Sequence, residues 1–189
     1  MQHSYGAPEW ILLHAGSTEI FHELDIPVFS AAGCSDSKTV DAQSASEAML
    51  QIYSALATGG NIIHDIGFME LGITGSALHM VMCNELVGEA KRFLKGIEVD
   101  EEHLAEEVIR EVGPGGNYLA EEHTMEFFRD EVWFARLANR ENYETWTENG
   151  SKDMTQRAQD QMLHLLKTHV PKPLSDEITA ALDRMMEKW

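Results

Sequence analysis

A histidine and an aspartate, His64 and Asp65, are the neighbouring side chains in this sequence that are best suited to chemistry. They lie in the short apolar stretch 61–66, between the glycine pair Gly59-Gly60 and a glycine-rich loop. A carboxylate in this position can face a cation, and an imidazole can bond a carboxylate. Since neighbouring strand side chains alternate in direction, only one of the two can point into a given site. The alternative is a hydrogen-bonded pair that only fixes the following loop.

A second polar group lies in the segment CSDSK, residues 34–38. Asp36 and Lys38 follow an extended run at 27–29, so they occupy the same place after a strand as the His-Asp pair does. The alternative is an ordinary loop turn in which Asp36 bonds its own backbone. Loop position favours a functional role, because binding residues are concentrated on loops.

Residues 70–75 supply flexible backbone after the His-Asp pair. Gly72 and Gly75 could let the chain approach a ligand closely, because glycine has no Cβ. Glu70 places a further carboxylate beside them. Tight packing before the next helix is the alternative for the two glycines.

A possible metal site involves the two cysteines. His79 and Cys83 stand four residues apart, so a helix would place them on one face. With Cys34 they would supply three of the four ligands that zinc usually takes. A lone His-x₃-Cys spacing falls short of a full ligand set, so we expect no metal, and zinc is the weaker alternative.

Helix and strand patterns alternate through the first 76 residues. We expect helices at 10–24 and 44–58, an extended strand around 28–29 and a short buried strand at 61–66. Apolar strands separated by a helix indicate a parallel sheet with crossover helices. A long polar loop follows each strand, as expected of a functional face at the strand carboxyl ends.

The rest of the chain is predicted to be helical. Ser76 begins a helix that ends at Gly96, and Asp100 caps another. The segment GPGGNYL, residues 113–119, then interrupts the helical pattern. Further helices are predicted at 121–139, 155–169 and 175–188, the last of them capped by Ser175.

Composition excludes several classes of partner. The net charge of −18, from 32 acidic and 14 basic residues, argues against nucleic acid and against an anionic membrane surface. No segment is long and apolar enough to cross a bilayer. Two cysteines do not make a disulfide framework, so we expect a reducing, cytoplasmic setting.

Two parallel strands leave both sheet edges open and cannot form a stable sheet alone. A complete (β/α)₈ barrel needs roughly 250 residues, and this chain has 189. We therefore expect an α/β fold, namely the C-terminal part of a (β/α)₈ TIM-type barrel followed by a helical C-terminal region. Residues 1–76 would be the last βα units of the incomplete barrel, and residues 77–189 the helical region that packs on it.

Five stretches of the chain, in order, resemble the C-terminal part of the trimethylamine:corrinoid methyltransferase family. They cover most of residues 5–150, and five stretches in register make a specific signal. The stretches are YGAPEW (5–10), GCSDSKTVDAQ (33–43), NIIHDIGFMELGITGS (61–76), RFLKGIEVD (92–100) and EVGPGGNYLAEEHT (111–124).

The resemblance implies an enzyme that moves a methyl group from a methylated or quaternary amine, of the trimethylamine or glycine betaine type, to the cobalt of a corrinoid protein. That partner protein would carry the corrinoid (cobalamin). Trimethylamine members of the family carry pyrrolysine. This sequence has only standard residues, which fits the glycine betaine branch or a chain that lacks the position. Cobalt(I) is a strong nucleophile, so the protein mainly has to hold the cationic amine in line with it.

The resemblance also gives the polar residues roles. Asp65 and His64 become the candidate catalytic pair, with Asp65 facing the cation, and aromatic faces join carboxylates in binding such a cation. Gly72 and Gly75 would let the corrinoid approach, and Lys38 would meet the carboxylate of a betaine. The candidate substrate-binding residues are Asp36, Lys38, Phe29, Phe68 and Glu70, with Tyr118 as a further cage candidate. The alternative for each aromatic ring is an ordinary core position.

Two other functions stay open at this point. The chain could be a noncatalytic binding or assembly module that docks a corrinoid protein or a separately encoded barrel half. It could also be a zinc-dependent thiol methyltransferase. We expect the full-length protein to be a homo-oligomer.

Overall fold

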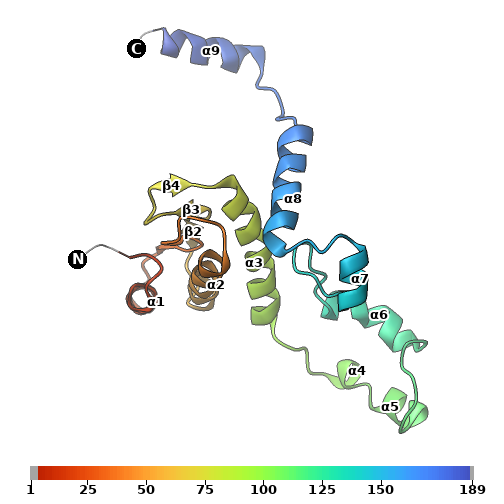
Figure 1. Ribbon diagram of the computed structural model, residues 1–189. Coiled ribbons are helices and arrows are strands. Elements are labelled where there is room, and N and C mark those ends of the chain that lie inside the picture. The colour runs from red at the N-terminus through yellow and green to blue at the C-terminus, as the bar shows by residue number, and fades with distance from the viewer. Residues whose placement is uncertain (1–3, 188–189) are drawn as a thin grey trace.

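The computed structural model describes residues 4–187 and shows a layered N-terminal unit from which helical segments extend (Figure 1). The fold is α/β, with many helices and few, short strands. In chain order the elements are α1 (Pro8–Glu23), β1 (Phe29–Ala31), α2 (Ala42–Ala57), β2 (Ile62–His64), β3 (Phe68–Met69), β4 (Thr74–Gly75), α3 (Ala77–Lys95), α4 (Glu101–Leu104), α5 (Glu106–Val112), α6 (Glu122–Glu131), α7 (Tyr143–Glu148), α8 (Met154–Thr168) and α9 (Asp176–Met186).

Strands β1 and β2 pair in parallel, which confirms the prediction from the apolar strand pattern. Phe29 lies opposite Ile62, and Ala31 lies opposite His64. The prediction that the second strand is buried is wrong for Ile62, whose exposed fraction is 61%; Phe29 opposite it is 62% exposed. Within residues 4–187 no further strand pairs with either edge of this sheet, so both of its edges are unpaired.

The glycine-bearing segment after β2 is a small antiparallel hairpin rather than a loose loop. Phe68 of β3 pairs with Gly75 of β4. The turn between them places Glu70, Leu71 and Gly72 at positive φ, of 51°, 59° and 80°. Strands of two residues are too short to show an alternating pattern, so this hairpin could not be predicted from hydrophobic periodicity.

The core lies between α2 and α3. Helix α2 begins at Ala42, two residues before the predicted start, because Asp41 and Ser44 form a reciprocal capping box. Helix α3 begins after Ser76, where its start was predicted, and the Ser76 side chain caps it by accepting a hydrogen bond from the His79 backbone N–H. The fully packed residues are Ala32, Ala48, Ile52, Ala55, Met82, Cys83, Leu86 and Ala90.

Two helices of the C-terminal half are shorter than the sequence predicted. The helix capped by Asp100 breaks at Ala105, which has φ 49° and separates α4 from α5. The helix predicted at 121–139 ends at Glu131. Beyond it, residues 136–138 all donate their backbone N–H groups to the carboxylate of Glu85 on α3. These N–H groups therefore do not make the hydrogen bonds that would continue the helix.

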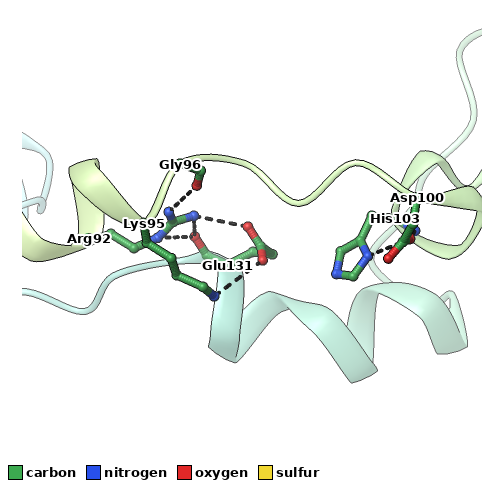
Figure 2. Close-up of polar contacts among 6 residues, drawn as sticks. All are labelled: Arg92, Lys95, Gly96, Asp100, His103 and Glu131. Atoms are coloured by element: carbon green, nitrogen blue, oxygen red, sulfur yellow. Dashed lines mark hydrogen bonds and ion pairs between the residues drawn. The ribbon is translucent and has the colours of Figure 1, made fainter.

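Arg92 joins the end of α3 to the end of α6 (Figure 2). Its Nη2 lies 2.6 Å from the backbone oxygen of Glu131 and 3.0 Å from Glu131 Oε2, and its Nη1 donates to the Gly96 oxygen at 2.9 Å. Lys95 Nζ adds a longer ion pair to Glu131 Oε1, at 3.8 Å. The two helix ends are therefore fixed to each other, although 39 residues of sequence separate Arg92 from Glu131.

The last helix, α9, is capped by Ser175 as predicted. Its predicted end at Lys188 lies outside the described residues. Helix α8 packs against α3, whereas α9 follows an extended connection and lies away from the N-terminal unit (Figure 1). The apolar side chains of α9 are exposed, namely Ile178, Leu182, Met185 and Met186.

Across residues 4–187 the helices are all too short or too polar to span a bilayer.

His14 on α1 makes the stability of the N-terminal unit depend on pH. Its Nε2 accepts a hydrogen bond from the Ala31 N–H at 3.1 Å, which requires an unprotonated Nε2. Burial, and secondly the nearby His64, lower the pKa of His14 below its usual 6.5. The unfolded chain therefore takes up a proton at a higher pH than the folded chain does, so the stabilisation is complete above about pH 6.5 and is lost as the pH falls.

We expect the free energy of unfolding in urea to fall between pH 8 and pH 5.5, and to fall less in His14→Gln. The glutamine amide oxygen can accept from Ala31 but takes up no proton in this range. His169→Gln, at an exposed histidine, is the matched control and should keep the wild-type dependence. An equal loss in wild type and His14→Gln would contradict this role of His14.

Candidate functional site

A hollow of about 80 Å³ lies beyond the carboxyl ends of the parallel strands. Three of the residues that line it were predicted as site residues, and they come from the segment after β2. Its lining residues are Tyr5, Cys34, Asp65, Phe68 and Gly72. The hollow therefore brings together a carboxylate, two aromatic rings and a glycine, at the sheet end where parallel α/β folds place their ligands.

Asp65 presents the carboxylate of this hollow. Its backbone is left-handed, with φ 70°, a conformation that aspartate tolerates better than most residues. Asp65 Oδ1 lies 2.7 Å from His64 Nδ1, and the Asp65 side chain is 29% exposed. The backbone oxygen of Asp65 also accepts from the Phe68 N–H at 3.2 Å. The carboxylate is therefore held in place and still reachable from solvent.

His64 does not line the hollow. Its ring stacks on Phe29 with the ring centroids 4.0 Å apart and the planes 14° from parallel. Only the imidazole edge reaches the site, through the contact with Asp65. Only one of the pair lines the hollow, as expected, but strand alternation is not the cause, because Asp65 lies after the end of β2 and has φ 70°. Phe29, which stacks on His64, does not line the hollow either. Tyr118 lies in the exposed connection before α6 and is not among the lining residues.

The structure places Asp36 and Lys38 outside the hollow. Asp36 accepts hydrogen bonds from Ser4 Oγ and from the backbone N–H groups of Tyr5 and Gly6, the latter two at 3.1 Å. Lys38 Nζ donates to the backbone oxygen of Asp36 at 2.8 Å. Asp36 thus binds the N-terminal segment, which is neither the substrate contact nor the local turn that the sequence suggested.

Glu70 and Gly75 lie in the β3–β4 hairpin beside the hollow. Glu70 Oε2 accepts from Thr74 Oγ1 at 2.7 Å across the turn. No atom would lie within 4 Å of a Cβ added at Gly75, so this position is open to an approaching molecule. Gly72 differs, because a Cβ there would lie 3.3 Å from the Tyr5 ring.

Two residues of the site escaped prediction as site residues. Tyr5 precedes the first helix, far in sequence from either strand, and it was noted only as part of the stretch YGAPEW. Gln51 lies in the middle of α2, where nothing in the helical pattern distinguishes it. It is buried, and its side chain bonds the backbones of Tyr5 and Cys34. Tyr5 and Gln51 could have been identified only by knowing that the N-terminal segment, the loop after β1 and α2 contact one another.

The two cysteines are protonated thiols in this environment. Burial raises the pKa of both Cys34 and Cys83 to about 12. Cys34 Sγ donates to Gln51 Oε1 at 3.1 Å, and Cys83 Sγ donates to the Gly33 oxygen at 3.4 Å and lies 3.6 Å from His79 Nε2. In the part of the chain that the structure describes, no three His, Cys, Asp or Glu residues could hold a metal ion together.

A family model, described as trimethylamine methyltransferase (MTTB), matches residues 2–189. The chain belongs to the trimethylamine methyltransferase family. This confirms the resemblance drawn from the five sequence stretches, and it places the chain in a family of enzymes.

Curated relatives agree with the family assignment. The trimethylamine methyltransferase MttB of Desulfitobacterium hafniense (strain DSM 10664 / DCB-2) is 36% identical over 183 residues, and the glycine betaine methyltransferase of D. hafniense (strain Y51) is 34% identical over 180 residues. The MttB of Methanosarcina thermophila is 33% identical over 173 residues. These matches cover 97%, 95% and 92% of this chain and 37%, 37% and 36% of the relatives, so the chain spans little more than a third of their length.

Proposed function

We propose that this chain is the amine-binding, C-terminal part of a (β/α)₈-barrel methyltransferase that moves a methyl group from a methylated amine to the cobalt of a corrinoid protein. The observation that carries the proposal is the hollow at the strand carboxyl ends, where Asp65 lies beside the rings of Tyr5 and Phe68. A carboxylate and aromatic faces are the groups that bind an alkylammonium cation. The substrate class comes from the relatives, a trimethylamine methyltransferase and a glycine betaine methyltransferase.

The work of the chain is to bind and orient. The Asp65 carboxylate attracts the ammonium group, and the aromatic rings pack against its methyl groups. The corrinoid that the partner protein carries would supply cobalt(I), whose electron pair forms the new bond to the methyl group. The substrate binds as a cation, either a quaternary ammonium or protonated trimethylammonium, so the nitrogen keeps the pair of the broken C–N bond, leaves as a neutral amine and needs no proton from a residue. The open face at Gly75 and the exposed hairpin turn leave room for the partner.

The residues of the hollow favour a simple methylated amine over glycine betaine. None of the described residues that line it is Lys, Arg or His. A betaine carboxylate would therefore lie close to Asp65 with no cation to offset the repulsion. Lys38, the predicted carboxylate contact, is bonded to its own loop instead.

Exposed apolar side chains support the second candidate, an assembly module. Large apolar residues are exposed on and just after α1 and on the β1–β2 sheet, and exposed apolar surface can mark a contact with another protein segment. They are Leu12, Leu13, Ile20, Phe21, Leu24, Phe29 and Ile62. A barrel half supplied by other residues, whether of the same or of another polypeptide, would cover them.

A methyl-transfer assay tests the proposal. It supplies trimethylamine or glycine betaine with cob(I)alamin and monitors the change in corrinoid absorbance. We expect transfer that depends on the amine, with trimethylamine preferred. Binding of a corrinoid protein without transfer from either amine would favour the assembly module. If the chain instead transferred methyl groups from thiols, and a zinc chelator abolished that transfer, both the amine methyltransferase and the assembly module would be contradicted.

A further inference from the structure

We infer that Tyr5 is the aromatic wall against which the ammonium group packs, and that Asp36 and Gln51 are positioning residues that act through it. The inference rests on the proposed function, since it concerns the same hollow. It assigns a binding role to a residue that precedes the first helix, and it gives Asp36 a different role from the substrate contact that the sequence suggested.

Asp36 and Glu47 fix the N-terminal segment to the loop after β1. Asp36 accepts from Ser4 Oγ and from the N–H groups of Tyr5 and Gly6. Glu47 Oε2 accepts from the Asp36 N–H at 2.9 Å, and a Cβ added at Gly6 would lie 2.4 Å from the Glu47 carboxyl carbon. A side chain at position 6 would therefore have to displace the Glu47 carboxylate from this contact, and the backbone on both sides of Tyr5 is held.

Gln51 on α2 also fixes the N-terminal segment. It is 1% exposed, and its Nε2 donates to the backbone oxygens of Tyr5 at 3.0 Å and Cys34 at 2.8 Å. Its Oε1 accepts from the Cys34 N–H at 3.2 Å and from Cys34 Sγ at 3.1 Å. One buried amide thus sets the positions of two residues that line the hollow, and none of its hydrogen-bonding groups is spare.

The Tyr5 ring is set by contacts on two sides. It meets the Trp10 ring edge-on, with the centroids 5.2 Å apart and the planes at 71°. A Cβ at Gly72 would lie 3.3 Å from Tyr5 Cε2, so the glycine lets the ring lie close to the hairpin. Asp65 and Phe68 line the same hollow. A cation there would lie near an aromatic face and a carboxylate, which is the arrangement that binds quaternary ammonium ions.

The test is calorimetric titration of the chain with tetramethylammonium chloride. We expect Tyr5→Leu to raise the Kd about tenfold and Tyr5→Phe to stay within about twofold, because the face of the ring carries the attraction. Gln51→Leu and Gly72→Ala should raise the Kd severalfold by displacing the ring. Tyr143→Leu, at an exposed tyrosine on α7, is the matched control and should bind as wild type.

Double variants separate positioning from a direct or purely structural effect. If Gln51 and Asp36 act through Tyr5, then Gln51→Leu and Asp36→Asn will weaken binding in the wild-type background and will add little in the Tyr5→Leu background. The same fold-loss in both backgrounds would overturn the positioning role. Far-ultraviolet circular dichroism of each variant identifies any that is unfolded, and Tyr5→Phe supplies the rescue.

The outcomes also separate this inference from the proposed function. A wild-type chain that binds tetramethylammonium, with Tyr5→Leu unchanged, overturns the inference and leaves the proposed site intact. A wild-type chain that binds no tetramethylammonium contradicts the amine site itself. Binding that Tyr5→Leu weakens and Tyr5→Phe restores supports both.

Discussion

Replacing Asp65 with asparagine should weaken amine binding by about 10- to 100-fold while the chain stays folded. At a separation of about 5 Å and an effective dielectric constant of about 20, the attraction between a carboxylate and an ammonium group is about 3 kcal/mol, and partial exposure reduces it. Asparagine keeps the shape of the side chain and tolerates the left-handed backbone at φ 70°. The charge is therefore the main thing that changes.

The loss should appear in KM more than in kcat. Positive charge on the nitrogen decreases as the methyl group leaves, so the carboxylate stabilises the bound amine more than it stabilises the transition state. Steady-state methyl transfer at varied amine concentration gives both constants. Asp25→Asn is a close control, because Asp25 is also an aspartate at positive φ, is exposed and lies outside the hollow. If Asp65→Asn and Asp25→Asn gave the same KM, Asp65 would not contact the amine.

The second large effect concerns stability. Glu85→Ala should lower the free energy of unfolding by about 3 kcal/mol, because the Glu85 carboxylate accepts from three successive backbone N–H groups, of Arg136, Leu137 and Ala138, at 2.8, 2.8 and 3.1 Å. Without it these donors lose their partner, and the segment after α6 loses its attachment to α3. Glu85→Gln keeps an oxygen acceptor and should lose about 1 kcal/mol.

Urea denaturation measures these changes, and hydrogen exchange locates them. The amides of residues 136–138 should exchange faster in Glu85→Ala, while amides of the β1–β2 sheet change less. The comparison is with Glu89→Ala, one helical turn further along α3, where the carboxylate makes only a 3.8 Å surface ion pair with Arg140. Equal stability of the Glu85 and Glu89 variants would show that the three hydrogen bonds do not hold this segment.

Local patterns predicted the features that neighbouring residues determine. The parallel strands, the start of a helix at Ser76, the caps at Asp100 and Ser175, and the break at 113–119 all depend on residues close together in sequence. Asp65 was predicted as a site residue because it lies at the end of a strand, Phe68 because an aromatic ring can bind a cation, and Gly72 because a glycine permits close approach. Their roles remain predictions until binding is measured.

Features that depend on distant partners could not be read from the sequence in this way. The end of α6 is fixed by Glu85, 46 positions before Glu131. The residues around Asp36 predict only a polar loop. Its role in binding the N-terminal segment depends on where residues 4–6 lie in the fold. The division into residues 1–76 and 77–189 stays a prediction, although α3 of the second part packs against α2 of the first.

The hydrogen bonds and ion pair between Arg92 and Glu131 make the segment between these two residues tolerant of a change in length. They close a loop that holds α4 and α5 and contributes no residue to the hollow. The entropy of closing a loop grows only with the logarithm of its length, so each doubling costs about 0.6 kcal/mol. Insertions or deletions between residues 97 and 121 should therefore leave the amine site undisturbed. This makes the exposed turn at 113–116 a suitable place to graft a tag or a reporter domain.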